Sequence, residues 1–357
     1  MQLDDSQLFL SNRLLHLILM PTEQCNFRCV YCYEDFVGGE MGRAVVDAVK
    51  ALMRRRVAHL DLLSVEWFGG EPLLAWPIVE EIQSYAQHLT RRHDGVRLAG
   101  AMTTNGSLLG EARFRRLLRL GVTRYQISLD GDREAHDRQR RRRGGGGSFK
   151  AIWHNLLGMR AVPGDFQVLL RLHATRANLG PLERLLHDLS RDFAGDPRFP
   201  VMFKAVRRFG GPCDASIPVL ARDREEEVLD RLCQQASHLG IAVQRSPFLE
   251  EGILKGCYAA AVNSYVVRSN GDLAKCTVAL RHDQNRVGTL RRDGTVELDS
   301  RKMMSWIRGA LTGHSESIMC PMKEWAEVSP VAPAPIRHGG DSPATLLPRR
   351  PGSGSAQ

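Results

Sequence analysis

Residues 22–34 read TEQCNFRCVYCYE and place three thiols, Cys25, Cys29 and Cys32, within eight positions. They directly follow an apolar β-type run, Leu14–Met20. Three cysteines this close in sequence converge on one metal centre only when the segment is a loop. Three thiolates are one ligand short of closing a tetrahedral zinc site or a four-iron cluster. The pattern therefore predicts a metal centre with one open position for an exchangeable ligand.

Two simpler interpretations of the triplet stay open on these residues alone: a structural zinc site completed by a distant histidine or cysteine, and three packed cysteines. The chain holds 8 cysteines, and we expect no disulfide framework because the cytosol keeps thiols reduced. A cytoplasmic location is predicted, since no apolar run reaches the roughly 18 residues of a membrane-spanning helix. The acidic start at Asp4 and Asp5 also argues against a signal peptide.

Composition and charge narrow the class of protein. The chain has 357 residues, of which 43% are apolar and 25% charged, as in ordinary soluble globular proteins. This balance excludes a wholly disordered chain, a collagen-like chain and a coiled-coil rod. Lysine and arginine number 49 against 40 aspartates and glutamates, a net charge of +9. On its own such a charge is weak support for a nucleic-acid partner.

Short apolar runs alternate with amphipathic helical stretches up to about residue 206. In the first helical stretch Val45, Val49, Leu52 and Met53 share one face. Strands that alternate with helices of this length pair in parallel through right-handed crossovers, and are buried on both faces. Six such units predict an open, partial α/β barrel with its chemistry at the carboxyl ends of the strands. The expected strands are Leu14–Met20, Leu63–Phe68, Leu98–Thr103, Arg124–Leu129, Gln167–His173 and Pro200–Val206.

The cysteine spacing resembles the signature of the radical S-adenosylmethionine (SAM) superfamily. That signature is Cys-x3-Cys-x2-Cys with an aromatic residue, here Tyr31, before the last cysteine. The resemblance covers roughly residues 14–206. It implies a [4Fe–4S] cluster on Cys25, Cys29 and Cys32 whose fourth iron is chelated by the amino and carboxylate groups of SAM. It also implies reductive cleavage of SAM and hydrogen abstraction by the resulting 5′-deoxyadenosyl radical.

Further motifs stand where the expected strands end. WFGGEPLL follows the second strand, TTNG the third and SLDG the fourth, and HDRQR comes next. Glycines let the backbone approach a ligand closely, and a carboxylate receives an ammonium group. In the family the first segment holds the SAM amino group, and in peptide-modifying members the later ones supply a ribose contact and a carboxylate-binding arginine. The resemblance thus implies cofactor contacts from Tyr31, Gly69, Gly70, Glu71, Asn105, Ser128 and Arg140.

A second set of cysteines lies in the C-terminal third. Cys257 and Cys276 are separated by 18 residues that span an expected hairpin, and Cys320 follows. This resembles the auxiliary-cluster module of radical SAM enzymes, called SPASM in its long form and twitch in its short form. The long form carries seven cysteines for two clusters, so three support at most one auxiliary [4Fe–4S] cluster, with an open iron or a borrowed ligand such as Cys213. The alternative is a module that has lost its cluster, and Cys233 is expected in the core.

A run of arginines, Arg138 and Arg140–Arg143, leads into Gly144–Gly147. For Arg141–Arg143 the simpler interpretation is a solvated surface loop, and the sharper one is a guide for an acidic peptide. His136 and Asp137 are expected to shape this loop. Tyr258, beside Cys257, is expected either in a substrate pocket or in the hairpin core.

The predicted fold class is α/β, a partial (β/α)6 barrel followed by a small hairpin-rich auxiliary-cluster domain. A helix over Asp223–His238 is expected to bridge the two, hairpins to turn at Asn270-Gly271 and Asp293-Gly294, and a short helix to cover Lys302–Leu311. The expected segments are an N-terminal extension (1–13), the barrel (14–210), a bridging helix and linker (211–247), the SPASM/twitch-like domain (248–326) and a disordered Pro/Gly-rich tail (327–357).

The motifs look most like those of peptide- and protein-modifying members, so the favoured function is cross-linking, oxidation or epimerisation of a ribosomal peptide. The expected partners are that peptide, a separate leader-recognition protein and a reductant such as flavodoxin or ferredoxin, with no membrane and no nucleic acid. An anaerobic sulfatase maturase is one alternative, although Thr277 stands where those enzymes carry Asp. Dehydrogenation of a small alcohol or sugar is another. A zinc-stabilised nucleic-acid binder leaves the ordered motifs unexplained, and no catalytic acid or base is identified.

Overall fold

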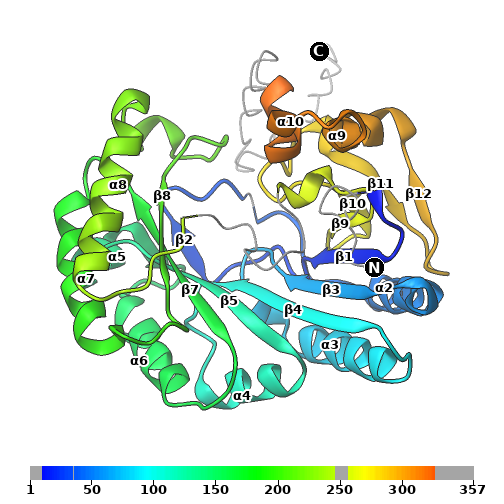
Figure 1. The fold of residues 1–357 in the computed structure, drawn as a ribbon, viewed down its shortest axis with the longest axis horizontal. Coiled ribbons are helices and arrows are strands. Elements are labelled where there is room, and N and C mark those ends of the chain that lie inside the picture. Colours follow the sequence, from blue (N-terminus) through cyan, green and yellow to red (C-terminus); the bar gives the residue numbers. More distant parts are fainter. Residues whose placement is uncertain (1–9, 35, 246–255, 326–357) are drawn as a thin grey trace, which may run out of the picture.

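The computed structural model describes residues 10–34, 36–245 and 256–325. Its main feature is a curved sheet of ten strands in the order β12-β11-β10-β9-β1-β3-β4-β5-β7-β8 (Figure 1). Six parallel neighbours in this sheet are the strands expected from the sequence, each within two residues of its expected ends. They are β1 (Leu14–Leu19), β3 (Leu62–Trp67), β4 (Arg97–Thr104), β5 (Val122–Leu129), β7 (Gln167–Ala174) and β8 (Val201–Ala205).

Helices cover the convex face of this arc (Figure 1). Apolar residues at alternate positions of β1, Leu15, Leu17 and Leu19, are buried in the same core as Val49 of the first helix. Parallel crossovers place the helices on that face, as the sequence predicted. These helices are α2 (Arg43–Arg56), α3 (Trp76–Arg91), α4 (Glu111–Arg119), α5 (Arg133–Gln139), α6 (Phe149–Arg160), α7 (Leu179–Phe193) and α8 (Arg222–His238).

The C-terminal part contains the two expected hairpins and the expected helix, together with a second short helix, α10 (Ser315–Met319), that the sequence did not predict. Its hairpins are β9 (Ser264–Val267) with β10 (Asp272–Ala274), and β11 (Arg286–Leu290) with β12 (Val296–Leu298). Their turns fall at the predicted Asn-Gly and Asp-Gly pairs. The two helices, α9 (Ser300–Thr312) and then α10, follow.

This C-terminal part continues the barrel sheet, which the sequence did not predict. β9 pairs in parallel with β1, with Leu17 opposite Tyr265. All four residues of β9 are buried, as in a strand with neighbours on both sides. On the concave side, Ala260 and Ala261 pack against Leu14. The module therefore closes one edge of the barrel and covers part of its inner face.

A second, two-stranded sheet was also not predicted. β2 (Phe27–Cys29) lies within the cysteine loop and pairs antiparallel with β6 (Arg140–Arg142). The expected tail, 327–357, and most of the expected N-terminal extension lie outside the described residues. Across the described ranges, no helix combines the length and the apolar character that crossing a membrane requires.

Candidate functional site

The three cysteines of the first set lie on a loop at the carboxyl end of β1. Cys25 is buried, and its sulfur accepts a hydrogen bond from the backbone N–H of Phe27 at 3.3 Å. Cys29 is the last residue of β2 and lies opposite Arg140 of β6 in the two-stranded sheet. Cys32 follows in a turn closed by its N–H to the carbonyl of Cys29 at 3.1 Å. The loop geometry that the sequence required is confirmed.

The donor set of this loop fits an iron–sulfur cluster. Burial raises the pKa of Cys25 and of Cys32 to about 12, so these thiols hold their protons until a cation displaces them. Within the described ranges, no three His, Cys, Asp or Glu side chains are placed to hold a single metal ion. A four-iron cluster takes each thiolate on a different iron, so the three sulfurs need not meet at one point.

Gly69 and Gly70 bring the loop after β3 against the cysteine loop. A Cβ on Gly69, whose φ is +115°, would lie 2.3 Å from the carbonyl oxygen of Thr22. A Cβ on Gly70 would lie 2.4 Å from that of Gln24. Such distances are far inside van der Waals contact, and only glycine fits at either position. The close approach that these glycines permit in the structure is therefore between two stretches of backbone.

Glu71 has no exposed surface, and its carboxylate is already occupied inside the fold. It accepts hydrogen bonds from the hydroxyl of Thr104 at 2.8 and 2.9 Å and from the backbone N–H groups of Leu73 (3.1 Å) and Asn105 (2.8 Å). Burial raises its pKa despite these donors. The carboxylate joins the ends of β3 and β4, so the geometry does not support its expected use as the acceptor of an ammonium group.

Asn105 ties the end of β4 to the cysteine loop. Its amide donates to the side-chain oxygen of Asn26 at 2.8 Å, and its own oxygen accepts from the hydroxyl of Ser107 at 2.7 Å. The Asn26 amide in turn donates to that hydroxyl at 3.1 Å. Three polar side chains thus form a closed ring beside Cys25.

A buried polar network centres on Asp130, at the end of β5. Its carboxylate accepts from the hydroxyl of Tyr31 at 2.5 Å, contacts His173 Nδ1 at 3.0 Å and lies 3.8 Å from the guanidinium of Arg140. Arg140 donates to the Tyr31 hydroxyl at 2.5 Å. Burial alone would raise the pKa of Asp130, but His173 and Arg140 outweigh it and hold that pKa well below its usual range. The network holds in place Tyr31 and Arg140, two of the cofactor contacts expected from the sequence.

The remaining expected contact residue, Ser128, precedes this network on β5 and lies opposite Arg171 of β7. The structure thus gathers the segments of all seven expected cofactor contacts along the carboxyl ends of β1, β3, β4 and β5. His136 and Asp137 shape the following loop as expected. His136 contacts the hydroxyl of Ser148 at 3.0 Å, and Asp137 accepts from the N–H groups of Ser148 (2.7 Å) and Phe149 (2.9 Å).

The second cysteine set also comes together. Tyr258, next to Cys257, lies 2.8 Å from the hydroxyl of Thr277, next to Cys276, and burial raises the pKa of Cys257 to about 12. The sulfur of Cys276 accepts from the N–H of Val278 at 3.3 Å, the same two-residue pattern as at Cys25. The Cys257 N–H donates to the carbonyl of Ile318 at 2.9 Å, which ties this cysteine to the helix before Cys320.

Cys213 and Tyr258 were open questions in the sequence. Cys213 is exposed, and its loop packs on the first cysteine set, since a Cβ on Gly211 would lie 2.4 Å from the carbonyl oxygen of Cys32. This position does not support Cys213 as an auxiliary ligand. The Tyr258 hydroxyl accepts from the N–H of Thr277 at 3.0 Å and lies 2.8 Å from the Thr277 hydroxyl, so it belongs to the module's own core.

Several site residues were missed by sequence reasoning. Tyr33 follows Cys32 directly, and its ring packs edge-on against that of Phe209, with 5.8 Å between the ring centres. Glu23, just before the cysteine loop, forms a buried ion pair with Arg268 of the module. Arg171 alternates with buried Leu170 and Leu172 on β7, and this polar residue within an apolar strand was the available signal.

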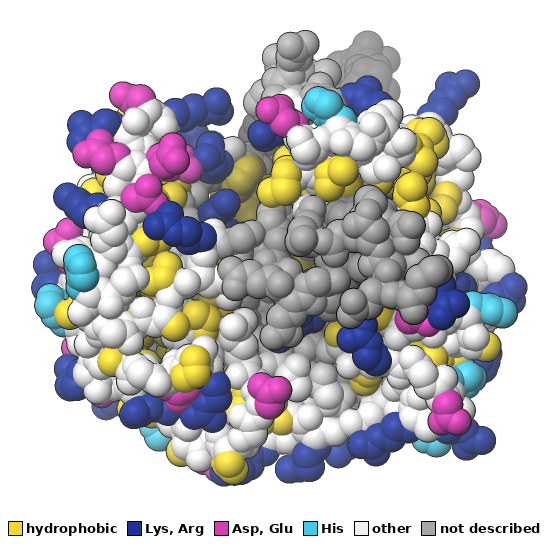
Figure 2. Space-filling view, viewed as in Figure 1, with side chains coloured by type: hydrophobic (Ala, Val, Ile, Leu, Met, Phe, Trp, Pro, Cys, Tyr) yellow, Lys and Arg dark blue, Asp and Glu magenta, His cyan; other side chains and the backbone are white. Residues whose placement is uncertain are grey.

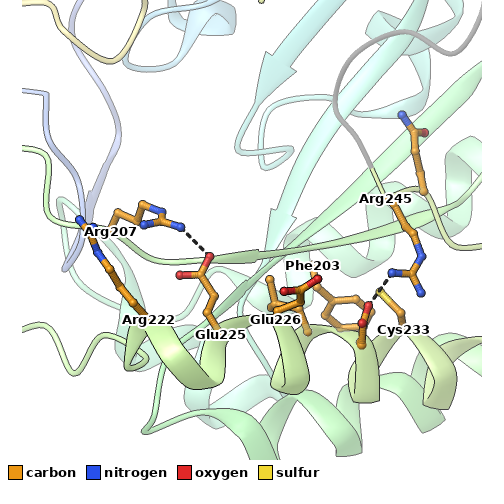
Figure 3. Close-up of a pocket in the computed structure, with 10 residues that line it drawn as sticks. Phe203, Arg207, Arg222, Glu225, Glu226, Cys233 and Arg245 are labelled. Carbon is orange, nitrogen blue, oxygen red and sulfur yellow. Dashed lines mark hydrogen bonds and ion pairs between the residues drawn. The ribbon is translucent and has the colours of Figure 1, made fainter. Parts of the chain in front are cut away.

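A cavity of about 510 Å³ lies elsewhere, along α8 (Figure 3). Two ion pairs cross it, Arg207 to Glu225 at 2.7 Å and Arg245 to Asp230 at 2.5 Å. Cys233 lines it but is buried in the main core, as expected from the sequence. Figure 2 shows Lys and Arg side chains spread around the rim of one face, with Asp and Glu among them. The charge of that face is thus not gathered into one patch.

Comparison with known proteins agrees with this geometry. The model of the Radical SAM superfamily matches residues 19–166. A GTP 3′,8-cyclase of Parasynechococcus marenigrum is 36% identical over 124 residues, which are 33% of this chain and 34% of that protein. An Fe-coproporphyrin III synthase of Methanosarcina barkeri is 29% identical over 127 residues, 33% of this chain and 28% of that protein. The chain spans about a third of the length of the curated relatives it matches.

Solved structures share the fold over most of the chain. That of anSMEcpe with bound AdoMet and a peptide has a TM-score of 0.62 at 17% identity, covering 86% of this chain and 88% of that one. That of Streptococcus suis SuiB bound to its precursor peptide SuiA has a TM-score of 0.55 at 16% identity, covering 86% and 68%. The cofactors implied by the match to this superfamily are a [4Fe–4S] cluster and SAM. The cysteine loop and the strand-end motifs all lie within residues 19–166, so this part of the chain is similar to the Radical SAM superfamily.

Proposed function

We propose that this protein is a radical SAM enzyme that modifies a peptide between its two cysteine sets. The observation that carries the proposal is the contact of the cysteine loop with the C-terminal module, where Glu23 pairs with Arg268 and accepts from the N–H (3.3 Å) and hydroxyl (3.0 Å) of Ser269. A substrate on the concave side of this contact borders both cysteine sets. SuiB was solved with its precursor peptide and anSMEcpe with a peptide, and both share this fold.

The residues of the first site have distinct parts in this proposal. Cys25, Cys29 and Cys32 hold the cluster, and the backbone of 69–71, Asn105, Ser128 and Arg140 hold SAM. When bound, cluster and SAM supply a carbon-centred radical that removes a hydrogen atom from the substrate. Tyr31 and Arg140 are held in place by Asp130, so their geometry is set before SAM arrives.

The runner-up, formylglycine formation as in sulfatase maturases, needs a carboxylate that this module lacks at the matching position. Thr277 occupies it, with its hydroxyl beside that of Tyr258. We also propose that the protein lies in the cytosol, because the six cysteines proposed as cluster ligands require a reducing compartment.

The proposal is tested by anaerobic reconstitution with iron and sulfide, followed by incubation with SAM, dithionite and a candidate precursor peptide deuterated at its side chains. We expect 5′-deoxyadenosine that carries deuterium from the peptide. The peptide would be the wrong substrate if 5′-deoxyadenosine stayed unlabelled with every peptide tried but carried deuterium from a deuterated sugar. The substrate would then be a small molecule.

An auxiliary cluster on Cys257, Cys276 and Cys320 makes a separate prediction. Wild type should bind about eight irons, and the triple alanine variant about four, because each cubane cluster holds four. SAM cleavage should persist in the variant, since the first site is untouched. About four irons in both proteins would mean that the module packs without a cluster.

The reductant is proposed to be a small acidic one-electron donor such as flavodoxin, docked on the exposed part of the arginine run. β6 pairs with the strand that carries Cys29, and the Arg143 N–H donates to the carbonyl of Asn26 at 2.7 Å. Arg138, Arg141 and Arg143 are exposed and line a surface cavity of about 830 Å³ beside this ribbon. An electron that enters at this cavity has one strand, β6, to cross before it reaches the strand that carries Cys29.

Reversing these three charges (Arg138→Glu, Arg141→Glu, Arg143→Glu) should slow cluster reduction by reduced flavodoxin about tenfold or more at low salt, as for electrostatically steered partners. The matched control is Arg91→Glu, Arg92→Glu, Arg119→Glu, exposed arginines at the opposite ends of the strands. Stopped-flow absorbance follows the reduction. Equal slowing with dithionite would show damage to the site, and unchanged flavodoxin rates would place the donor elsewhere.

A further inference from the structure

The concave faces of β7 and β8 carry cationic side chains. On β7, Arg171 and His173 alternate with Leu170, Leu172 and Ala174, which are buried on the helix side. The register places His173 opposite Lys204 of β8 and Arg171 opposite Met202. Arg171 and Lys204 are therefore near neighbours on one wall of the barrel.

Neither cation has a partner within the described residues. Arg171 is half-buried, and its Nε is closed to solvent and makes no hydrogen bond. No hydrogen bond or ion pair within this part of the chain engages the rest of its guanidinium or the Lys204 ammonium. The carboxylates nearby are already engaged: Asp130 by Tyr31 and His173, and Glu225 by Arg207. Arg171 is thus a desolvated cation without an acceptor, which is unfavourable unless a ligand completes it, whereas Lys204 beside it is exposed to solvent.

The two cations lie beside the first site. Arg171 is opposite Ser128 of β5 in the register, and His173 on the same strand contacts Asp130 at 3.0 Å. Burial lowers the pKa of Arg171, and burial together with Arg171 lowers the pKa of Lys204. The same wall thus borders the place where the proposed substrate reacts.

We propose that Arg171 and Lys204 form an anion subsite for a carboxylate of the substrate, so that the modified peptide carries an Asp or Glu beside its reacting residue. The planar fork of a guanidinium matches a carboxylate with two parallel hydrogen bonds, and the ammonium adds a second charge. This inference rests on the proposed function. SAM also bears a carboxylate and is the other source of the same chemistry.

The test measures binding to the reconstituted full chain, without relying on turnover. Affinities are determined by calorimetry for SAM, and at saturating SAM for GTP and two capped pentapeptides, Gly-Gly-Glu-Gly-Gly and its Gln counterpart. Three variants are compared with wild type. The first combines Arg171→Gln with Lys204→Gln, and the second is Arg171→Lys. The third is a control that combines Lys150→Gln with Arg160→Gln, both at exposed positions of α6.

We expect wild type and the control pair to bind the Glu peptide at least tenfold more tightly than the Gln peptide. The double variant should lose this preference, and Arg171→Lys should keep part of it. All variants should bind SAM with an affinity within twofold of wild type. No preference in wild type, or a preference that survives in the double variant, overturns the subsite. If the double variant binds SAM tenfold more weakly, the subsite holds the carboxylate of SAM. If wild type binds GTP and the double variant does not, the subsite holds a nucleotide. Either result overturns the assignment to a peptide. The proposed function fails separately, by absence of 5′-deoxyadenosine from wild type with SAM and dithionite.

Discussion

Replacing Cys25, Cys29 and Cys32 together by alanine should abolish formation of 5′-deoxyadenosine and lower the bound iron by about four atoms, one cubane cluster. The three thiols are the only cysteines of the loop within the described residues. A loss of three thiolates leaves the cluster without protein ligands. Iron and sulfide analysis of anaerobically reconstituted protein, with chromatographic detection of the nucleoside, measures both effects.

The matched control is Cys213→Ala, which removes an exposed cysteine whose loop packs on the same site. This variant should keep its iron and its SAM cleavage. If the triple variant keeps its iron while Cys213→Ala loses it, the assignment of the first cluster to the loop after β1 is wrong.

Asp130→Asn should destabilise the fold by about 3–5 kcal/mol, the usual cost of removing one partner from a buried ion pair. The carboxylate has no exposed surface and is the common partner of Tyr31, His173 and Arg140. The variant leaves the Arg140 guanidinium without its counter-charge. Urea unfolding followed by circular dichroism gives the free energy of unfolding of both proteins.

The same chemical change at an exposed pair provides the control. Asp61 pairs with Arg13 at the surface, with 44% of its side chain exposed, and Asp61→Asn should cost at most about 1 kcal/mol. An equal loss in the two variants would contradict the importance of the buried network.

The stability difference between wild type and Asp130→Asn should depend on pH with a definite sign. His173 and Arg140, against the opposing effect of burial, hold the pKa of Asp130 below its unfolded value of about 3.9. A carboxyl with a depressed folded pKa contributes stability above its unfolded pKa and loses it as the pH falls toward the folded value. The difference should therefore be constant near neutral pH and shrink below about pH 4. A difference that grows in acid would contradict the depressed pKa.

The barrel strands and the strand-end motifs were predictable because their signals are local. Leu14–Leu19 and Gln167–Ala174 are short apolar runs bounded by turn residues, and parallel pairing follows from the helices between them. The cysteine loop was equally readable, since its ligands fall within eight positions. The two hairpins were fixed by their Asn-Gly and Asp-Gly turns.

Contacts between distant parts of the chain were not predictable in this way. The hydrogen bond of Tyr31 to Asp130 joins residues 99 apart, and that of Arg268 to Glu23 joins residues 245 apart. The sequence marked Glu71 as a ligand for a cation, yet its carboxylate is consumed by Thr104 and Asn105. Residue type indicates what a side chain can bind, whereas its partner depends on register, which is set by the whole sheet.

The parallel pairing of β9 with β1 bears on how this protein can be cut or recombined. β1 has a neighbour on each side, β3 and β9, with Leu17 facing Val65 on one side and Tyr265 on the other. A fragment ending before residue 256 would leave the first strand of the barrel as a bare, apolar edge, the kind of edge that drives aggregation. Exchange of the C-terminal module between homologues therefore succeeds only when the donor brings a strand that fits this edge in the same register.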